Sequence, residues 1–214
     1  MASMDFKKKE LHTALDPSRT ALLIVDMQND FVKDEGYLGQ RKHGIDVVQE
    51  TIPVIKRLLE HFRNNGLMVV YTETVHMRYT NSLNWVSRSA EKSLDPMICK
   101  SGTWGAETIP ELKPLENEPV IQKHRYDAFM DTDLHVVLRS NNISNLVIVG
   151  TQTNLCVEST ARHAYMMDYM TIMVSDGVST PETEYQAPLL KNFSENFGYV
   201  MSAEEVLQEL KKQN

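Results

Sequence analysis

The sequence predicts a three-layer α/β fold in which a doubly wound, mostly parallel sheet lies between helices on both faces. Three observations carry this prediction. Apolar runs of strand length recur along the chain, and several of the segments between them carry apolar residues at helical spacing. Such alternation is typical of parallel sheets, because each connection has to cross one face of the sheet. The length of 214 residues favours a single domain over residues 1–214, with residues 1–18 as an N-terminal arm.

The first part of the chain contains two of the expected strands and a long helix. Residues 20–26, TALLIVD, contain a continuous apolar run of the kind that is buried on both faces of a parallel sheet. Apolar residues then recur at helical spacing over residues 45–62, and Pro53 within this pattern predicts a kink or a restarted helix. Residues 67–72, LMVVYT, are the second expected strand.

A long irregular segment, residues 75–119, follows the second strand and carries both tryptophans. A segment of this length without clear periodicity indicates a functional loop. The third strand ends at Lys123, and a helix capped by Asp131 or Thr132 follows it, with apolar residues over 134–138. The remaining expected elements are a strand at 145–150, a helix after Cys156, a strand at 170–176, a helix through Phe193, a short strand at 199–200 and a last helix from Ser202.

Composition excludes several classes of partner. A net charge of -7 and a pI near 5.5 argue against a nucleic-acid partner, which requires a basic face. The one basic cluster, residues 7–9, is followed by Glu10 and is expected in the solvated arm. No apolar run approaches the roughly 20 residues of a membrane helix, and the N-terminus lacks the apolar core of a secretory signal. Two cysteines form neither a disulfide framework nor a four-thiolate zinc site, so we expect a cytoplasmic protein with free thiols.

Reactive side chains stand at the carboxyl ends of three expected strands. Asp26 ends the first strand, Lys123 ends the third, and Cys156 follows the turn after the fourth. Ligands of doubly wound sheets bind at this edge. Each residue has a structural alternative, because aspartates cap turns, lysines are solvated and lone cysteines fill cores. Together, a carboxylate and an ammonium beside a thiol supply a base and a stabilised thiolate, so the three are candidate catalytic residues.

Cys156 is expected in the first turn of its helix. The unpaired N–H groups and the positive end of the helix dipole favour an anion there, which predicts a thiol pKa below the usual value of roughly 8.5. The same N–H groups can stabilise the oxyanion of a tetrahedral intermediate. The small residues Thr151, Thr153 and Asn154 leave room for a carbonyl group to approach.

Three sequence blocks, LLIVDMQNDF, KHRYDAFMDTDL and VGTQTNLCVESTARHAYMMDY, occur in this order, and SGTWGAE at 101–107 accompanies them. In these blocks the chain resembles the isochorismatase-like cysteine hydrolases, which have a Rossmann-like fold. The resemblance implies a catalytic triad of Asp26, Lys123 and Cys156. It also implies a cis peptide bond between Thr151 and Gln152, and an oxyanion hole formed by the N–H groups of Gln152 and Cys156.

Family branches differ at recognisable positions. Nicotinamide-hydrolysing members carry metal ligands where this chain has Thr74, His76 and Ile98, and a lone His76 makes no stable metal site. Isochorismatases themselves lack the nucleophilic cysteine. TNLCVESTAR and GTWGAE resemble most the branch of N-carbamoylsarcosine and ureidoacrylate amidohydrolases. The resemblance therefore implies hydrolysis of a C–N bond in a small amide or ureido compound, through a thioester or thiocarbamate, without metal or cofactor.

Several expectations stay open on the sequence alone. Candidate pocket residues are Gln28, Asn29, Phe31, Trp104 and Tyr126, and packing is the alternative for each. An arginine for a substrate carboxylate has four candidates: Arg78, Arg88, Arg125 and Arg162. The resemblance implies a homodimer or homotetramer. The alternatives to the amidohydrolase are a nicotinamidase-type amidase and a catalytically silent binding protein of the same fold.

Overall fold

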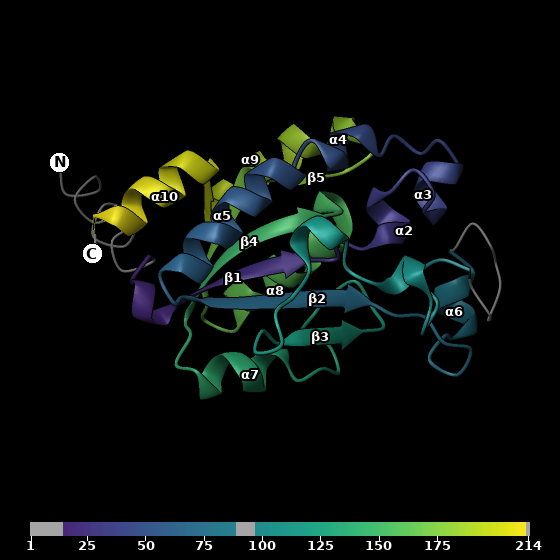
Figure 1. Cartoon of the computed structure of the whole chain (residues 1–214), viewed down its shortest axis with the longest axis horizontal. Helices are drawn as coiled ribbons and strands as arrows, with labels where there is room; N and C mark the ends of the chain where they lie inside the picture. The colour runs from purple at the N-terminus through teal and green to yellow at the C-terminus, as the bar shows by residue number, and fades with distance from the viewer. Residues whose placement is uncertain (1–14, 89–96, 213–214) are drawn as a thin grey trace.

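The computed structural model describes residues 15–88 and 97–212, and within them six strands form one sheet in the order β3-β2-β1-β4-β5-β6. Every pairing in this sheet is parallel. The chain starts in the middle of the sheet, moves to one edge, returns to the middle and moves to the other edge (Figure 1). The structure therefore confirms the doubly wound α/β fold. Its topological switch point lies between β1 and β4.

The elements have the following bounds. The strands are β1 (Thr20–Val25), β2 (Met68–Thr74), β3 (Val120–Lys123), β4 (Asn145–Thr151), β5 (Met170–Ser179) and β6 (Tyr199–Met201). The α-helices are α2 (Asn29–Val32), α3 (Tyr37–Gln40), α4 (Asp46–Gln49), α5 (Ile52–Asn64), α6 (Leu83–Val86), α7 (Leu134–Ser140), α8 (Glu158–Met166), α9 (Gln186–Asn196) and α10 (Ala203–Lys211). Four short 3₁₀ segments are η1 (Pro17–Arg19), η2 (Trp104–Ala106), η3 (Pro110–Leu112) and η5 (Thr183–Tyr185), and η4 (Thr153–Val157) is a π-helical turn, all within the described residues.

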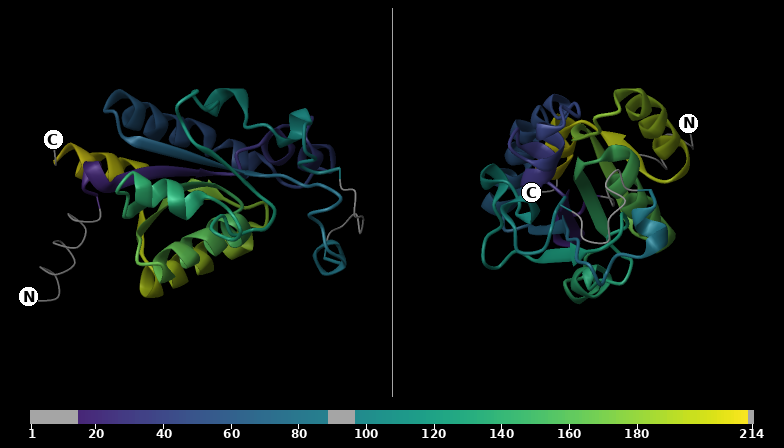
Figure 2. Two further views of the ribbon diagram at one scale, coloured as in Figure 1. Left: turned by 90° about the horizontal axis from the view of Figure 1, so that it is seen from below. Right: turned by 90° about the vertical axis from the view of Figure 1, so that its right-hand side faces the viewer.

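Helices cover both faces of the sheet because alternate strand residues point to opposite sides. In β1, Leu22 and Ile24 face a core formed with α5 and α10, whereas Leu23 and Val25 face a core formed with α7, α8 and α9. The left view of Figure 2 shows α5 on one side of the sheet and α8 and α9 on the other. All six residues of β1 are buried, which explains why the strand reads as one continuous apolar run.

Two local features, at Pro53 and at the start of α7, differ from the sequence prediction or sharpen it. Pro53 marks a restart, since α4 ends at Gln49 and α5 begins at Ile52 with the proline in its first turn, where its missing N–H is tolerated. Neither predicted cap of α7 occupies the cap position. Asp133 does, and the Thr132 hydroxyl accepts a hydrogen bond from the Leu134 N–H at 3.2 Å.

Residues 15–18, which were predicted to end an N-terminal arm, belong to the packed domain instead. Leu15 is fully buried in the core on the α5 side of the sheet, and the Asp16 side chain caps η1. Among the described residues, the packed domain therefore already includes Leu15 and does not start only after residue 18. The basic cluster at residues 7–9 lies outside the described residues. None of the helices within residues 15–88 and 97–212 is long and apolar enough to cross a membrane.

Candidate active site

The structure brings Asp26, Lys123 and Cys156 together at the carboxyl edge of the sheet. The Nζ atom of Lys123 lies 2.7 Å from Oδ2 of Asp26 and 3.3 Å from Sγ of Cys156. Asp26 follows β1, Lys123 ends β3, and Cys156 lies in η4 after β4. The three helices α2, α3 and α6 gather beyond this edge in Figure 1. The topology of the sheet thus places the three candidate catalytic residues side by side.

Two threonines of β2 orient the Asp26 carboxylate. The Thr72 hydroxyl donates to Oδ1 at 2.7 Å, and the Thr74 hydroxyl donates to Oδ2 at 2.8 Å. Residues 72 and 74 share one face of the strand, so both hydroxyls reach the same carboxylate. Asp26 itself adopts a positive φ of 50°, which turns the chain sharply at the end of β1. The fully buried carboxylate is therefore held by hydrogen bonds on both oxygens as well as by Lys123.

Lys123 is a fully buried cation with four polar neighbours. Its Nζ donates to Thr74 Oγ1 at 2.7 Å and to the Arg125 carbonyl at 3.0 Å, in addition to its contacts with Asp26 and Cys156. Burial opposes the charged form, but the Asp26 carboxylate and the Cys156 sulfur outweigh it and raise the pKa of Lys123 above its ordinary value. The ammonium is therefore a permanent charge between the carboxylate and the thiol.

Cys156 lies in a π-helical turn, not in the first turn of an α-helix as predicted. α8 begins only at Glu158, and the N–H groups of Leu155 and Val157 both donate to the Gln152 carbonyl. π-turns of this kind are frequent at functional sites. The residue is 7% exposed and lines a cavity, so its sulfur is accessible from that cavity.

The predicted lowering of the Cys156 pKa is wrong for the ligand-free site. Burial raises the pKa of Cys156 to about 12, and the positive charge of Lys123 only partly opposes this shift. The positive end of a helix dipole favours a thiolate, but the desolvation of the thiolate is the larger effect here. In the ligand-free protein the residue is a neutral thiol.

The peptide bond between Thr151 and Gln152 is cis, at the position that the resemblance indicated. The preceding residue, Gly150, has a φ of 117°, and a Cβ atom there would lie 2.1 Å from the Val25 carbonyl oxygen. Only glycine permits β4 to approach β1 this closely. The close approach brings the turn with Gln152 and Cys156 next to Asp26.

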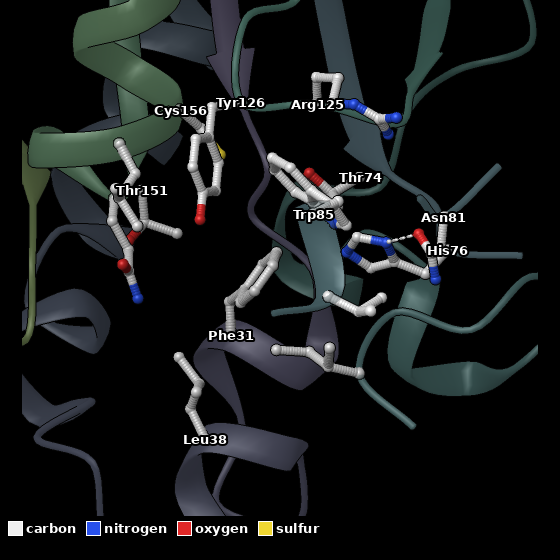
Figure 3. A pocket seen from close by; sticks show the side chains of 14 residues that line it. Phe31, Leu38, Thr74, His76, Asn81, Trp85, Arg125, Tyr126, Thr151 and Cys156 are labelled. Atoms are coloured by element: carbon white, nitrogen blue, oxygen red, sulfur yellow. Dashed lines mark hydrogen bonds between the residues drawn. The ribbon is translucent and has the colours of Figure 1, made fainter. Parts of the chain in front are cut away.

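A cavity of about 190 Å³ opens beside Cys156 (Figure 3). It is lined by Phe31, Leu38, Thr74, His76, Asn81, Trp85, Val86, Ile98, Arg125, Tyr126, Thr151, Gln152, Leu155 and Cys156. Two of the predicted pocket residues, Phe31 and Tyr126, therefore lie where the sequence analysis expected them.

Gln28, Asn29 and Trp104 do not line the cavity, and the prediction of pocket walls there is wrong. The fully buried amide of Gln28 donates to the carbonyls of Thr74 and Ala106 and accepts from the Thr74 N–H, so it joins the end of β2 to η2. Asn29 donates to the Trp104 carbonyl, whereas the Trp104 side chain is 47% exposed. The side chains of Gln28 and Asn29 therefore hold the loop around the site, and the Trp104 side chain takes no part in these contacts.

Among the four candidate arginines, only Arg125 lines the cavity. Its Nη1 donates to the His124 carbonyl at 2.6 Å and to the Thr80 carbonyl at 3.2 Å, and its guanidinium lies 5.0 Å from the ring centroid of Trp85. Arg162 pairs with Glu158 on α8 instead. Arg78 and Arg88 are absent from the lining, like Arg162.

The positions that match metal ligands in the nicotinamidase branch carry other roles here. Thr74 bonds both Asp26 and Lys123, and the Nδ1 atom of His76 lies 3.2 Å from Asn81 Oδ1. Burial lowers the pKa of His76, which keeps its ring neutral. Within the described ranges, no group of three or more His, Cys, Asp or Glu side chains is arranged to hold a metal ion.

Several lining residues were missed by the sequence analysis. Trp85, Asn81 and Val86 belong to the long segment between β2 and β3, and Leu38 lies in the short helix α3. The segment itself was predicted to be functional, but it lacks a periodicity that would say which side chains point inward. A tryptophan in such a loop was the one available signal.

A parallel α/β sheet that carries a cysteine at a cavity, with a buried lysine and an aspartate in contact behind it, is typical of a cysteine hydrolase. Comparison with known proteins agrees with this class. The family model described as Isochorismatase domain matches residues 20–205. The chain is 33% identical over 199 residues to ureidoacrylate amidohydrolase RutB of Agrobacterium fabrum, and the match covers 87% of each chain.

Solved structures extend the comparison. N-carbamoylsarcosine amidase from Thermoplasma acidophilum superposes with a TM-score of 0.72 at 27% identity and covers 87% of this chain and 97% of its own. A cysteine hydrolase from Pseudomonas syringae pv. phaseolicola has the same fold, with a TM-score of 0.83, 24% identity, and 94% and 96% of the two chains covered. The chain belongs to the isochorismatase domain family.

Proposed function

We propose that the protein is an amidohydrolase that uses Cys156 as its nucleophile and cleaves a C–N bond of a small amide or ureido compound. One observation carries the proposal. The Cys156 sulfur faces a cavity and lies 3.3 Å from the Lys123 ammonium, which in turn lies 2.7 Å from the Asp26 carboxylate. A thiol at a cavity, with a stabilising charge and a base next to it, meets the requirements for covalent catalysis at a carbonyl. The names of the ureidoacrylate and N-carbamoylsarcosine relatives support this substrate class.

In the first step, Asp26 takes the thiol proton while Sγ of Cys156 forms a bond to the substrate carbonyl carbon. The thiol pKa of about 12 means that this proton is not lost before substrate binds. Its transfer therefore accompanies the attack, and Lys123 stabilises the developing thiolate. The carbonyl oxygen becomes an oxyanion, which accepts hydrogen bonds from the N–H groups of Gln152 and Cys156.

In the second step, the tetrahedral intermediate collapses. The proton held by Asp26 passes to the leaving nitrogen, the C–N bond breaks, and ammonia or an amine leaves. Cys156 then carries a thioester if the substrate is an amide, or a thiocarbamate if it is a ureido compound.

In the third step, water replaces the departed nitrogen group. The water oxygen bonds to the acyl carbon while Asp26 takes a proton from the water. The C–S bond then breaks. The sulfur leaves as a thiolate beside Lys123 and recovers the proton from Asp26. No cofactor takes part in these steps. A thiol nucleophile of this kind is suited to the reducing cytoplasm, where we expect the protein to act.

Ammonia release from a panel of small amides and ureido compounds tests the proposal. The wild-type protein should release ammonia from at least one ureido compound, and Cys156→Ala and Cys156→Ser should release none while keeping the same circular dichroism spectrum. Trp104→Ala is the matched control, because the side chain is half exposed and does not line the cavity. Turnover that survives in Cys156→Ala excludes the nucleophile. A wild-type protein that turns over no compound would favour the silent binding protein.

A further inference from the structure

The surface that the cavity exposes is mostly apolar, although only half of the lining residues are. Seven of the fourteen described lining residues are aliphatic or aromatic, and they include Phe31, Leu38, Trp85 and Tyr126. The polar residues Thr151, Gln152 and Cys156 lie at the reacting end. Figure 3 shows His76 and Asn81 at the other end, hydrogen-bonded to each other. The non-reacting part of a substrate therefore meets apolar surface over most of its length.

The aromatic residues are arranged to hold a flat group. The rings of Trp85 and Tyr126 lie 4.7 Å apart at an interplanar angle of 53°, and Figure 3 shows Phe31 and Leu38 across the cavity from them. A cavity of roughly 150 Å³ is sufficient to bind benzene. The volume of about 190 Å³ therefore admits one ring together with a small carbonyl group. Aromatic walls favour such a ring through offset and edge contacts.

Arg125 is the one positively charged side chain among the fourteen described lining residues, and one of its terminal nitrogens is bound to the main chain. Its Nη1 donates to two main-chain carbonyls, those of His124 and Thr80. The guanidinium lies against Trp85, and in Figure 3 it extends away from Cys156. The other nearby cation, Lys123, directs its ammonium at Asp26, Thr74, the Arg125 carbonyl and Cys156.

A substrate carboxylate in the apolar part of the cavity beside Cys156 would consequently lose water without gaining a positively charged partner there. Burial of an unpaired carboxylate is far more costly than burial of an apolar group, and proteins avoid it by pairing the charge with an arginine or lysine. Among the described residues, Arg125 is the one arginine at the cavity, and its Nη1 atom holds the loop that carries it.

From these contacts we infer that the site selects an uncharged amide or ureido compound whose non-reacting part is a flat apolar group, such as an aryl ring, and discriminates against substrates that carry a carboxylate. Phe31, Trp85 and Tyr126 are the specificity-determining residues. The inference rests on the proposed function, because it assumes that the carbonyl group of the compound binds next to the nucleophile Cys156.

Three compounds test the selectivity: phenylurea, N-carbamoyl-β-alanine and the methyl ester of N-carbamoyl-β-alanine. The ester and the acid share the reacting group and differ in charge. We expect kcat/KM for ammonia release to be at least tenfold higher for the ester than for the acid, and at least as high for phenylurea as for the ester. A higher kcat/KM for the acid than for the ester overturns the inference.

Variants assign the selectivity to named residues. Phe31→Ala and Trp85→Ala should lower kcat/KM for phenylurea at least tenfold and lower it less for the ester, while Trp104→Ala leaves both unchanged. Arg125→Gln should change kcat/KM for the acid and the ester by the same factor. A loss confined to the acid would show that Arg125 binds a carboxylate and would overturn the inference.

Binding to Cys156→Ala separates this inference from the proposed reaction, because it requires no turnover. Calorimetry should detect phenylurea binding to this variant and at least tenfold weaker binding of the acid. If the wild-type protein hydrolyses none of the compounds but the variant shows this preference, the selectivity stands and the proposed reaction fails. If the variant binds the acid more tightly than phenylurea, or binds neither compound, the selectivity is wrong.

Discussion

The Lys123 ammonium and the Asp26 carboxylate form an ion pair, 2.7 Å between Nζ and Oδ2, and neither side chain has any exposure to solvent. Removal of one partner from such a pair leaves an uncompensated buried charge, which typically costs about 3–5 kcal/mol. We predict that Asp26→Asn and Lys123→Met each lower the free energy of unfolding by about this amount. Urea denaturation followed by circular dichroism measures it.

The double variant Asp26→Asn/Lys123→Met supplies the control. Because it removes both charges, it should be less destabilised than the sum of the single variants by about 1 kcal/mol or more. Strictly additive losses would show that the pair contributes no coupling energy.

The raised pKa of Cys156 predicts a loss of stability at alkaline pH. With a folded-state pKa of about 12, above the ordinary thiol value, the folded protein keeps a proton that the unfolded chain releases. The free energy of unfolding therefore falls as pH rises above the ordinary value, by at most about 1.4 kcal/mol per pH unit from this group. Urea titrations at a series of pH values from about 8 to about 11 should show a shallower decline for Cys156→Ala than for the wild-type protein. Equal slopes would mean that the thiol is not buried as the structure has it.

Alkylation by iodoacetamide compares the two thiols of the chain. Cys99 is fully buried, and burial raises its pKa well above the ordinary value, whereas Cys156 faces the cavity. We expect Cys156 to react at least ten times faster than Cys99, with a rate that keeps rising with pH because only the thiolate reacts. Mass spectrometry of the two tryptic peptides gives both rates. Faster modification of Cys99 would contradict the assigned nucleophile.

Asp30 fixes the loop that forms one wall of the site. Gly105 packs against the Asp30 carboxylate, and its lack of a side chain leaves room for that carboxylate. The Asp30 carboxylate accepts from the N–H groups of Tyr37 at 3.0 Å and Cys99 at 2.6 Å, and a Cβ atom on Gly105 would lie 2.2 Å from Asp30 Oδ2. The carboxylate is held and does not move aside. We predict that Gly105→Ala destabilises the protein by about 1–3 kcal/mol, as overpacking does.

Gly102→Ala is the matched comparison for Gly105→Ala in thermal denaturation. A Cβ atom there meets nothing within 4 Å, but the φ of +75° costs about 1 kcal/mol for a residue other than glycine. In addition, Gly105→Ala should raise KM through the loop, and Gly102→Ala should not. Equal effects of the two substitutions on both KM and stability would contradict the role of Asp30 in fixing the loop.

The sequence was sufficient for the sheet and for the three reactive residues, and the physical reason is the same for both. Buried parallel strands read as continuous apolar runs, and the chemistry of a doubly wound sheet lies where those runs end. Asp26 and Cys156 follow such runs, and Lys123 ends the short edge strand β3, so the rule that ligands bind at the carboxyl ends of the strands placed all three at one edge.

What the sequence did not reveal depends on packing between distant segments. Gln28 follows Asp26 closely and resembles a pocket residue, yet its amide joins the main chain at Thr74 and Ala106. The protonation of Cys156 depends on how much water reaches its sulfur, which no local pattern reports. Trp85 turns inward from a segment without periodicity, so only its residue type hinted at a role.

The place of β3 in the sheet has a consequence for how the protein loses activity. This strand is the outermost one beside β2, is four residues long, and holds Lys123 by its last pairing, with Thr74. Detachment of β3 from β2 would remove the Lys123 ammonium from between the thiol and the carboxylate while the rest of the sheet stays intact. The rate of turnover therefore reports local unfolding of β3. At low denaturant concentrations it should decline before the circular dichroism signal does.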